Sequence, residues 1–231
     1  MGSCQTASPP DWATATVASM VGIVALGDSL LDTERSWAWW LSEAMALPLR
    51  NLARSGSQAP DVIAEQLPQL AGYSYELACL SLGTNDVIQG AWSTPHFEDD
   101  LSQILGALQD CATKVVTHTV SLDLNQLPGA GGPEMRFRVE QLNAILKATS
   151  SREVLIASGT GLRGWRYMWA DKMHPTPLGQ ATLADRASEL LELSTVPSTL
   201  HAAEQPSRGQ HVRALAVQRV RHFAARPFVR G

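Results

Sequence analysis

The sequence predicts an α/β domain in which a mostly five-stranded parallel sheet carries helices on both faces. Short apolar segments alternate along the chain with segments of helical periodicity, five of each. This alternation is typical of parallel strands joined by right-handed helical crossovers. The strand-like segments are largely apolar and not alternately polar, as expected of strands covered on both sides. A chain of 231 residues, 45% hydrophobic and 17% charged, is large enough for one such domain with a sizeable core.

The expected strands are short and end at turn signals. The first holds only apolar residues and glycine and stops at Gly27, which suits a tight turn. The third is nearly all apolar and ends at Gly83. The full set of expected strands is residues 21–26, 47–52, 76–82, 114–120 and 153–157.

Apolar spacing and proline mark the expected helices. Pro48 ends the first helix, and Pro60 and Pro133 stand where two others begin, a position at which the missing N–H costs nothing. Trp37 and Trp40 share the apolar face of the first helix. We favour core packing for Trp37, Trp39 and Trp40, and the alternative is that these three residues form an aromatic box that faces a ligand. The expected helices are residues 36–47, 60–70, 96–111, 133–149 and 177–193.

Composition divides the chain into three parts. We expect a polar N-terminal arm over residues 1–20, the α/β domain over residues 21–194, and a linker with a basic C-terminal helix over residues 195–231. The last part holds six arginines and one glutamate, although the net charge of the chain is −4. A basic amphipathic helix over residues 210–225 permits weak contact with an anionic membrane surface. We favour a helix that packs on the acidic body or stays partly solvated, and we expect no nucleic-acid partner.

The cysteines and the apolar runs indicate which classes of protein to exclude. The three cysteines form no CxxC pair and have no histidine at metal-ligand spacing, so we expect neither a disulfide framework nor a zinc site. No apolar run approaches the roughly 18 residues of a transmembrane helix. No lysine or arginine precedes Arg35, and a cleaved signal would remove the first strand. We therefore expect a cytoplasmic protein.

Polar residues follow three of the expected strands. The pairs are Asp28-Ser29, Ser55-Gly56 and Asn85-Asp86. The carboxyl ends of parallel strands share one edge, where ligands and catalytic groups collect. Farther along, Asp171 and His174 are three residues apart, so the carboxylate can orient the imidazole while the other ring nitrogen faces a serine.

Each of these features also has a purely structural interpretation. Gly-Asp-Ser is common as a polar turn, and Asn85-Asp86 suits an Asx turn. His174 alone would be an ordinary residue at a helix start. We interpret Asp28 and Asp86 as structural, binding loop backbone and taking no part in catalysis.

Taken together, the blocks resemble the SGNH hydrolases, also called the GDSL esterase/lipase family. Four blocks occur in the family's order over residues 20–193. They are Gly27-Asp28-Ser29-Leu30, Gly56, Gly83-Thr84-Asn85-Asp86 and Asp171-Lys172-Met173-His174-Pro175. The resemblance implies a flavodoxin-like fold, a three-layer α/β/α sandwich. It also implies a carboxylic ester hydrolase, an esterase or lipase, that needs no metal or organic cofactor.

The resemblance also implies a role for each matching residue. Ser29 would be the nucleophile, His174 its general base and Asp171 the residue that holds His174. The oxyanion hole would combine the backbone N–H groups of Ser29 and Gly56 with the side-chain amide of Asn85. These residues predict a serine ester hydrolase that cleaves a small or medium acyl ester. An acyltransferase with the same acyl-enzyme and a non-catalytic binding module are the alternatives.

Overall fold

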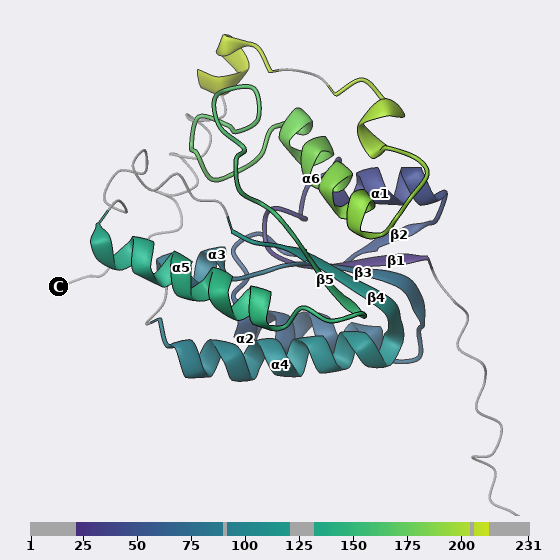
Figure 1. Ribbon diagram of the computed structural model, residues 1–231, viewed down its shortest axis with the longest axis vertical. Coiled ribbons are helices and arrows are strands. Elements are labelled where there is room, and N and C mark those ends of the chain that lie inside the picture. The colour runs from purple at the N-terminus through teal and green to yellow at the C-terminus, as the bar shows by residue number, and fades with distance from the viewer. Residues whose placement is uncertain (1–21, 90–91, 121–131, 204–205, 213–231) are drawn as a thin grey trace, which may run out of the picture.

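The computed structural model describes residues 22–89, 92–120, 132–203 and 206–212. Its centre is a five-stranded sheet with the strand order β2-β1-β3-β4-β5, in which every pairing is parallel (Figure 1). The strands are β1 (Ile23–Gly27), β2 (Leu49–Asn51), β3 (Tyr75–Ser81), β4 (Ala112–His118) and β5 (Val154–Ala157). The predicted parallel sheet and its five strands are confirmed, with ends that differ by a few residues.

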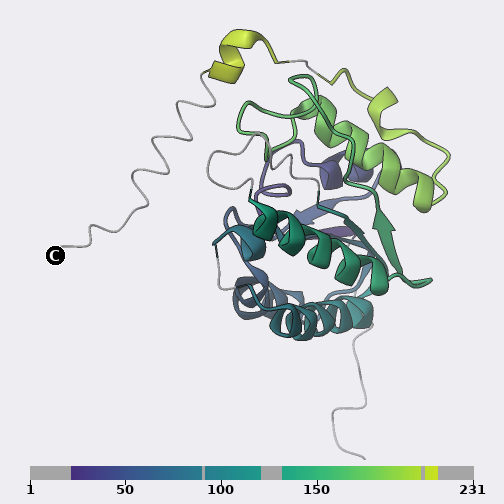
Figure 2. The same cartoon turned by 60° about the vertical axis from the view of Figure 1, so that its left-hand side comes forward.

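Helices cover both faces of this sheet and make a three-layer α/β/α sandwich (Figures 1 and 2). On one face lie α1 (Trp37–Met45) and α6 (Pro177–Leu190). The opposite face carries α2 (Ala59–Asp61), α4 (Thr94–Cys111) and α5 (Pro133–Ala148). The predicted fold class is therefore confirmed.

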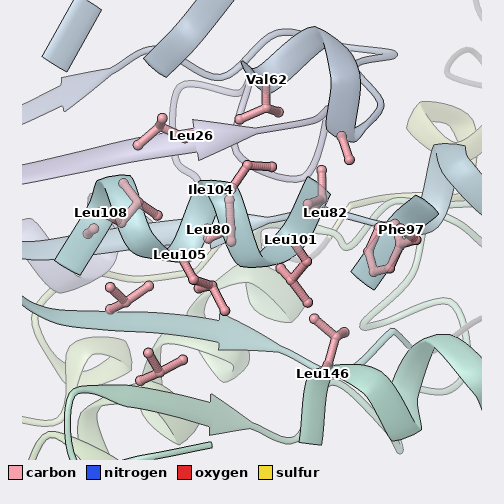
Figure 3. Packing of buried hydrophobic residues seen from close by; sticks show 14 of the residues in the cluster. Leu26, Val62, Leu80, Leu82, Phe97, Leu101, Ile104, Leu105, Leu108 and Leu146 are labelled. Carbon is pink, nitrogen blue, oxygen red and sulfur yellow. The ribbon is translucent and has the colours of Figure 1, made fainter. Parts of the chain in front are cut away.

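Alternate residues of β1, an interior strand of the sheet, contribute to the two cores. Val24 and Leu26 belong to a buried cluster that includes Ile104 of α4, and Figure 3 shows Leu26 and Ile104 in this cluster. Ile23 and Ala25 join the opposite cluster with α1 and α6. Trp37 and Trp40 are buried in that second cluster, and Trp39 packs against it partly buried, so the predicted core packing is confirmed. The packed cores fix the carboxyl edge of the sheet, where the polar blocks lie.

Two elements differ from the sequence prediction. The helix expected over residues 60–70 begins as α2, continues as a π-helical turn η2 (Val62–Gln66) and ends as a 3₁₀ turn η3 (Leu67–Leu70). A short helix α3 (Thr84–Gln89) follows β3 directly, although the sequence analysis expects only a turn there. Both differences lie beside the polar edge of the sheet.

The chain after α6 packs back on the domain. A 3₁₀ turn η4 (Pro197–Thr199) contacts α1 and α6, and His201 approaches Glu43 of α1 at 3.0 Å. Residues 208–212 are helical, whereas the rest of the basic helix expected over residues 210–225 and the arm over residues 1–20 lie outside the described residues. Of the helices in the described ranges, none has the length and apolar character needed to span a bilayer.

Candidate active site

The nucleophile candidate sits on a tight turn at the end of β1. Gly27 has φ +123°, and a Cβ at this position would lie 1.8 Å from the Ser81 carbonyl oxygen of β3. Only glycine therefore lets the chain turn here. The next residue, Asp28, is fully buried, and its Oδ1 accepts hydrogen bonds from the Leu30 N–H at 3.0 Å and the Ser81 hydroxyl at 2.8 Å. These bonds fix the backbone on both sides of Ser29.

Ser29, His174 and Asp171 form one continuous hydrogen-bonded chain. The Ser29 Oγ lies 2.8 Å from His174 Nε2, although the two residues are 145 positions apart. The other ring nitrogen, Nδ1, lies 2.7 Å from Asp171 Oδ2. A carboxylate can only accept at this distance, so Nδ1 carries the proton and Nε2 is left to accept from the serine hydroxyl. The structure thus brings together the three residues proposed from the sequence.

Hydrogen bonds within the loop hold Asp171 and His174 in place. Oδ1 of Asp171 accepts from the backbone N–H groups of Met173 and His174 at 3.0 and 3.1 Å. The Trp169 N–H donates to the His174 carbonyl at 2.8 Å, which closes the loop. Thr176 then caps α6 by accepting from the Gly179 N–H. The imidazole is therefore aimed by a closed turn at the start of a helix.

Opposing effects set the pKa of His174. Burial alone lowers it, but the hydrogen bond and the charge of Asp171, with a further contribution from the charge of Asp28, outweigh burial and raise the pKa. A carboxylate next to the ring favours the imidazolium in this way. The surroundings of His174 therefore stabilise the protonated form of its imidazole.

Of the three expected oxyanion donors, Gly56 and Asn85 are connected through Ser57. Among the described residues, nothing accepts a hydrogen bond from the backbone N–H of Ser29 or Gly56. Asn85, buried in the first turn of α3, donates from Nδ2 to the Ser57 carbonyl at 3.0 Å. An amide carries two N–H donors, so this bond leaves one for a ligand. Ser57 follows Gly56 directly, and the Asn85 bond therefore ties two of the expected donors together.

The two aspartates beside these blocks, the buried Asp28 and the partly buried Asp86, bind other parts of the protein. Asp86 accepts from the Ala59 N–H at 2.9 Å, and Asp28 makes the bonds described above. Burial raises the pKa of Asp86 and raises that of Asp28 to about 6. Both carboxylates hold loops in place, as the structural interpretation predicts.

Two positioning contacts have no signal in the sequence. Asp32 Oδ2 accepts from both the N–H and the hydroxyl of Ser55, at 2.8 and 2.6 Å, and so clamps the loop that holds Gly56. Gln66, fully buried in η2, bonds to Gly27 and Ser57. Side-chain bonds between loops 23 and 39 residues apart leave no periodic pattern that a sequence analysis could detect.

A small apolar cavity is lined by chain neighbours of the candidate site residues. Its volume is about 30 Å³. The lining includes Leu30, Thr84 and Met173, which are the chain neighbours of Ser29, Asn85 and His174. His118 also lines it, edge-on to Trp37 with Nε2 bonded to the Leu183 carbonyl at 2.9 Å, and burial lowers the pKa of this histidine to about 4. Within the described ranges, no cluster of three or more histidine, cysteine or acidic residues could hold a metal ion.

Comparison with solved structures shows the same fold in known hydrolases. An alpha/beta hydrolase enzyme from the metagenome of Lake Arreo in Spain is 16% identical, with a TM-score of 0.63 over 76% of this chain and 96% of that chain. A member of the lipolytic protein G-D-S-L family from Veillonella parvula is 17% identical, with a TM-score of 0.60 over 74% and 98%. A carbohydrate esterase of family 3 from Talaromyces cellulolyticus is 19% identical, with a TM-score of 0.55 over 75% and 97%.

Comparison at the level of sequence gives the family. None of the curated proteins matches the chain. The model of the GDSL-like lipase/acylhydrolase family matches residues 25–182, a span that holds Ser29, Gly56, Asn85, Asp171 and His174. The chain therefore belongs to the GDSL-like lipase/acylhydrolase family and is a carboxylic ester hydrolase of the SGNH type.

Proposed function

We propose that the protein hydrolyses a small acyl ester through an acyl-enzyme on Ser29. The observation that carries this proposal is the line of hydrogen bonds from Ser29 through His174 to Asp171, 2.8 and 2.7 Å long. A serine hydroxyl is a weak nucleophile until a neighbouring base takes its proton. The unprotonated Nε2 of His174 faces the Ser29 hydroxyl and is placed to do so.

In the first half of the reaction, the Ser29 oxygen attacks the ester carbonyl and its proton passes to His174 Nε2. The imidazolium then protonates the leaving alcohol as the tetrahedral intermediate collapses to the acyl-enzyme. In the second half, His174 takes a proton from water, the resulting hydroxide attacks the acyl carbon, and Ser29 leaves with the proton returned to it. Asp171 stays ionised throughout and stabilises the imidazolium.

The negative charge of each tetrahedral intermediate falls on the former carbonyl oxygen. We propose that the backbone N–H groups of Ser29 and Gly56 and the remaining N–H of Asn85 bind this oxygen. Each such preorganised donor contributes about 3–4 kcal/mol to transition-state stabilisation. Support comes from the Asn85 to Ser57 bond, which holds the amide beside Gly56 before substrate arrives.

The cavity beside the nucleophile favours a short acyl group. Its volume of about 30 Å³ has room for one or two groups the size of water or methyl. Its apolar lining includes Leu30 and Met173, which are the chain neighbours of Ser29 and His174. We therefore propose acetyl or another short acyl group as the part of the substrate that enters this cavity.

The test compares wild type with Ser29→Ala on the p-nitrophenyl esters of acetate, butyrate and octanoate. We expect hydrolysis to fall by about 10⁴-fold or more in Ser29→Ala, while Ser102→Ala, an exposed serine on α4, keeps wild-type activity. Among the wild-type rates, kcat/KM should be highest for acetate. Equal activity of Ser29→Ala and wild type would refute the nucleophile, and a preference for octanoate would refute the acyl pocket.

The same assay separates hydrolysis from acyl transfer. With p-nitrophenyl acetate as donor and a primary alcohol added as acceptor, a hydrolase releases acetate as the main product. An acyl acceptor that captures most of the acetyl group at low concentration would identify the protein as an acyltransferase. Failure of Ser29 to react with a fluorophosphonate would favour a binding module.

A further inference from the structure

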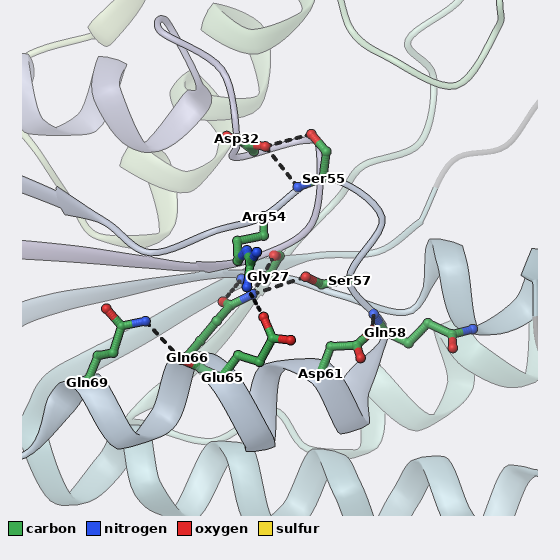
Figure 4. Close-up of polar contacts among 10 residues, drawn as sticks. All are labelled: Gly27, Asp32, Arg54, Ser55, Ser57, Gln58, Asp61, Glu65, Gln66 and Gln69. Atoms are coloured by element: carbon green, nitrogen blue, oxygen red, sulfur yellow. Dashed lines mark hydrogen bonds and ion pairs between the residues drawn. The ribbon is translucent and has the colours of Figure 1, made fainter. Parts of the chain in front are cut away.

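The side chain of Gln66 connects the two halves of the proposed active site. It is fully buried at the end of the π-helical turn η2. Its Oε1 accepts from the Gly27 N–H at 2.7 Å, and its Nε2 donates to the Gly27 carbonyl at 3.0 Å and to the Ser57 hydroxyl at 3.3 Å. Figure 4 shows Gln66 reaching from η2 to the sheet edge between Gly27 and Ser57.

Gln66 completes the hydrogen bonding of Gly27 where the pairing between β1 and β2 ends. The register of β2 against β1 ends at Ala25, whereas β3 pairs with β1 as far as Gly27. On the β2 side, the Gly27 carbonyl still accepts from the Arg54 N–H at 2.9 Å, whereas the Gly27 N–H donates to the Gln66 side chain at 2.7 Å. The carboxamide of Gln66 offers an acceptor and a donor at the spacing of a peptide group, and it bonds to both backbone groups of Gly27.

The second half of the contact reaches the oxyanion loop. Ser57 accepts the Gln66 bond with its hydroxyl and the Asn85 bond with its carbonyl. Its preceding neighbour is Gly56. The buried Gln66 side chain thus bonds both to Gly27, two positions before Ser29, and to Ser57, which is bonded to Asn85 and follows Gly56.

We propose that Gln66 is a positioning residue that sets the distance between the Ser29 nucleophile and the oxyanion donors Gly56 and Asn85. This inference rests on the proposed function, because the geometry matters only if Ser29 forms tetrahedral intermediates. A displacement near 1 Å at such a site lowers the rate by about 100-fold. The loss falls on the transition state and leaves ground-state binding nearly unchanged.

The test replaces Gln66 with methionine, which has a similar length and cannot make these hydrogen bonds. The matched control is Gln69→Met, because Gln69 lies in the next turn, is exposed, and donates to the Glu65 carbonyl (Figure 4). Rates with p-nitrophenyl acetate are expressed per serine titrated by a fluorophosphonate, so that misfolded protein does not count. We expect kcat of Gln66→Met to fall by about 10- to 100-fold with KM within about 3-fold of wild type, and Gln69→Met to match wild type.

A transition-state analogue separates positioning from a general structural role. Trifluoroacetone forms a tetrahedral adduct on serine whose oxyanion needs the same donors. Its inhibition constant should rise in Gln66→Met by the factor by which kcat/KM falls. A residue that only supported the fold would change the number of titratable serines and leave both constants per serine at their wild-type values, which would overturn the inference.

Ser57→Ala provides the second variant. It removes the hydroxyl that accepts from Gln66 and leaves both Gln66 to Gly27 bonds and the carbonyl that binds Asn85. We expect a smaller loss of kcat, about 3- to 10-fold per titrated serine. If Gln66→Met does not fold, wild-type kcat in Ser57→Ala overturns the inference. If the wild-type protein neither hydrolyses the ester nor reacts with the fluorophosphonate, the proposed function fails, a result distinct from failure of the positioning role alone.

Discussion

Replacing Asp28 with asparagine should change the pH dependence of stability by a predictable amount. Burial raises the pKa of this carboxyl from 3.8 to about 6, against the hydrogen bonds from Leu30 and Ser81, which lower it. Each pKa unit corresponds to about 1.4 kcal/mol, so ionised Asp28 costs the folded state about 3 kcal/mol at pH 8. Because the folded state binds its proton more tightly than the unfolded state, this cost grows as the pH rises from about 4 to about 6 and then stays constant.

Asparagine keeps the acceptor for Leu30 and Ser81 and carries no charge. Its N–H group would take the place of Oδ2, which has no hydrogen-bond partner among the described residues, and a buried donor left unpaired costs about 1–3 kcal/mol. This second cost does not depend on pH. The diagnostic quantity is therefore the stability difference between Asp28→Asn and wild type at two pH values.

Urea unfolding at pH 5 and pH 8 measures that difference. Linkage predicts that about half of the cost is present at pH 5, so Asp28→Asn should gain about 1.5 kcal/mol relative to wild type between the two pH values. The control is Asp99→Asn, an exposed carboxylate on α4, for which no comparable gain is expected. A stability difference for Asp28→Asn that is the same at both pH values would show that folding does not raise the pKa of this carboxyl.

We expect kcat/KM to rise with pH along a limb centred above pH 6.5, because Asp171 raises the pKa of the His174 imidazole despite its burial. A pH–rate profile with an acetate ester measures this limb, and a limb centred below pH 6.5 would contradict the prediction. Asp171→Asn should lower kcat by about 10⁴-fold and move the limb to lower pH, since the amide cannot stabilise the imidazolium. Gly27→Ala should cost at least about 2 kcal/mol in urea unfolding, because its Cβ would meet the Ser81 carbonyl at 1.8 Å; wild-type stability would show that the turn relaxes. Trp40→Ala should cost about 3–5 kcal/mol, since this side chain is fully buried against α6 and its neighbours, and a loss below 1 kcal/mol would contradict that packing.

Apolar runs and turn residues were sufficient to predict the sheet. Strands such as β1 and β3 are apolar because both faces are covered, and that composition is visible without any knowledge of their partners. Helix type was less accessible. The switch from α to π over Val62–Gln66 coincides with the insertion of Gln66 into the sheet edge, a tertiary contact that local propensity does not encode.

In the candidate site too, residues in local sequence blocks are predictable and residues that act through tertiary contacts are not. Ser29, Asp171 and His174 were identified because each stands in a short block of recognisable residues at a strand end or before a helix. Asp32 and Gln66 belong to no block, and their bonds to Ser55, Gly27 and Ser57 depend on how loops meet in space. Polar side chains that support a site from a distance are therefore the part that only the structure reveals.

The role of Ser29 as the nucleophile is tested most directly by locating the residue that a fluorophosphonate labels. A fluorophosphonate bearing a mass tag is incubated with wild type and with His174→Ala, and the labelled residue is located by peptide mass spectrometry. The account predicts a single adduct on Ser29 in wild type and a labelling rate at least about 100-fold lower in His174→Ala, because the imidazole 2.8 Å away removes the serine proton. A label on another residue, or equal labelling of both proteins, would contradict it.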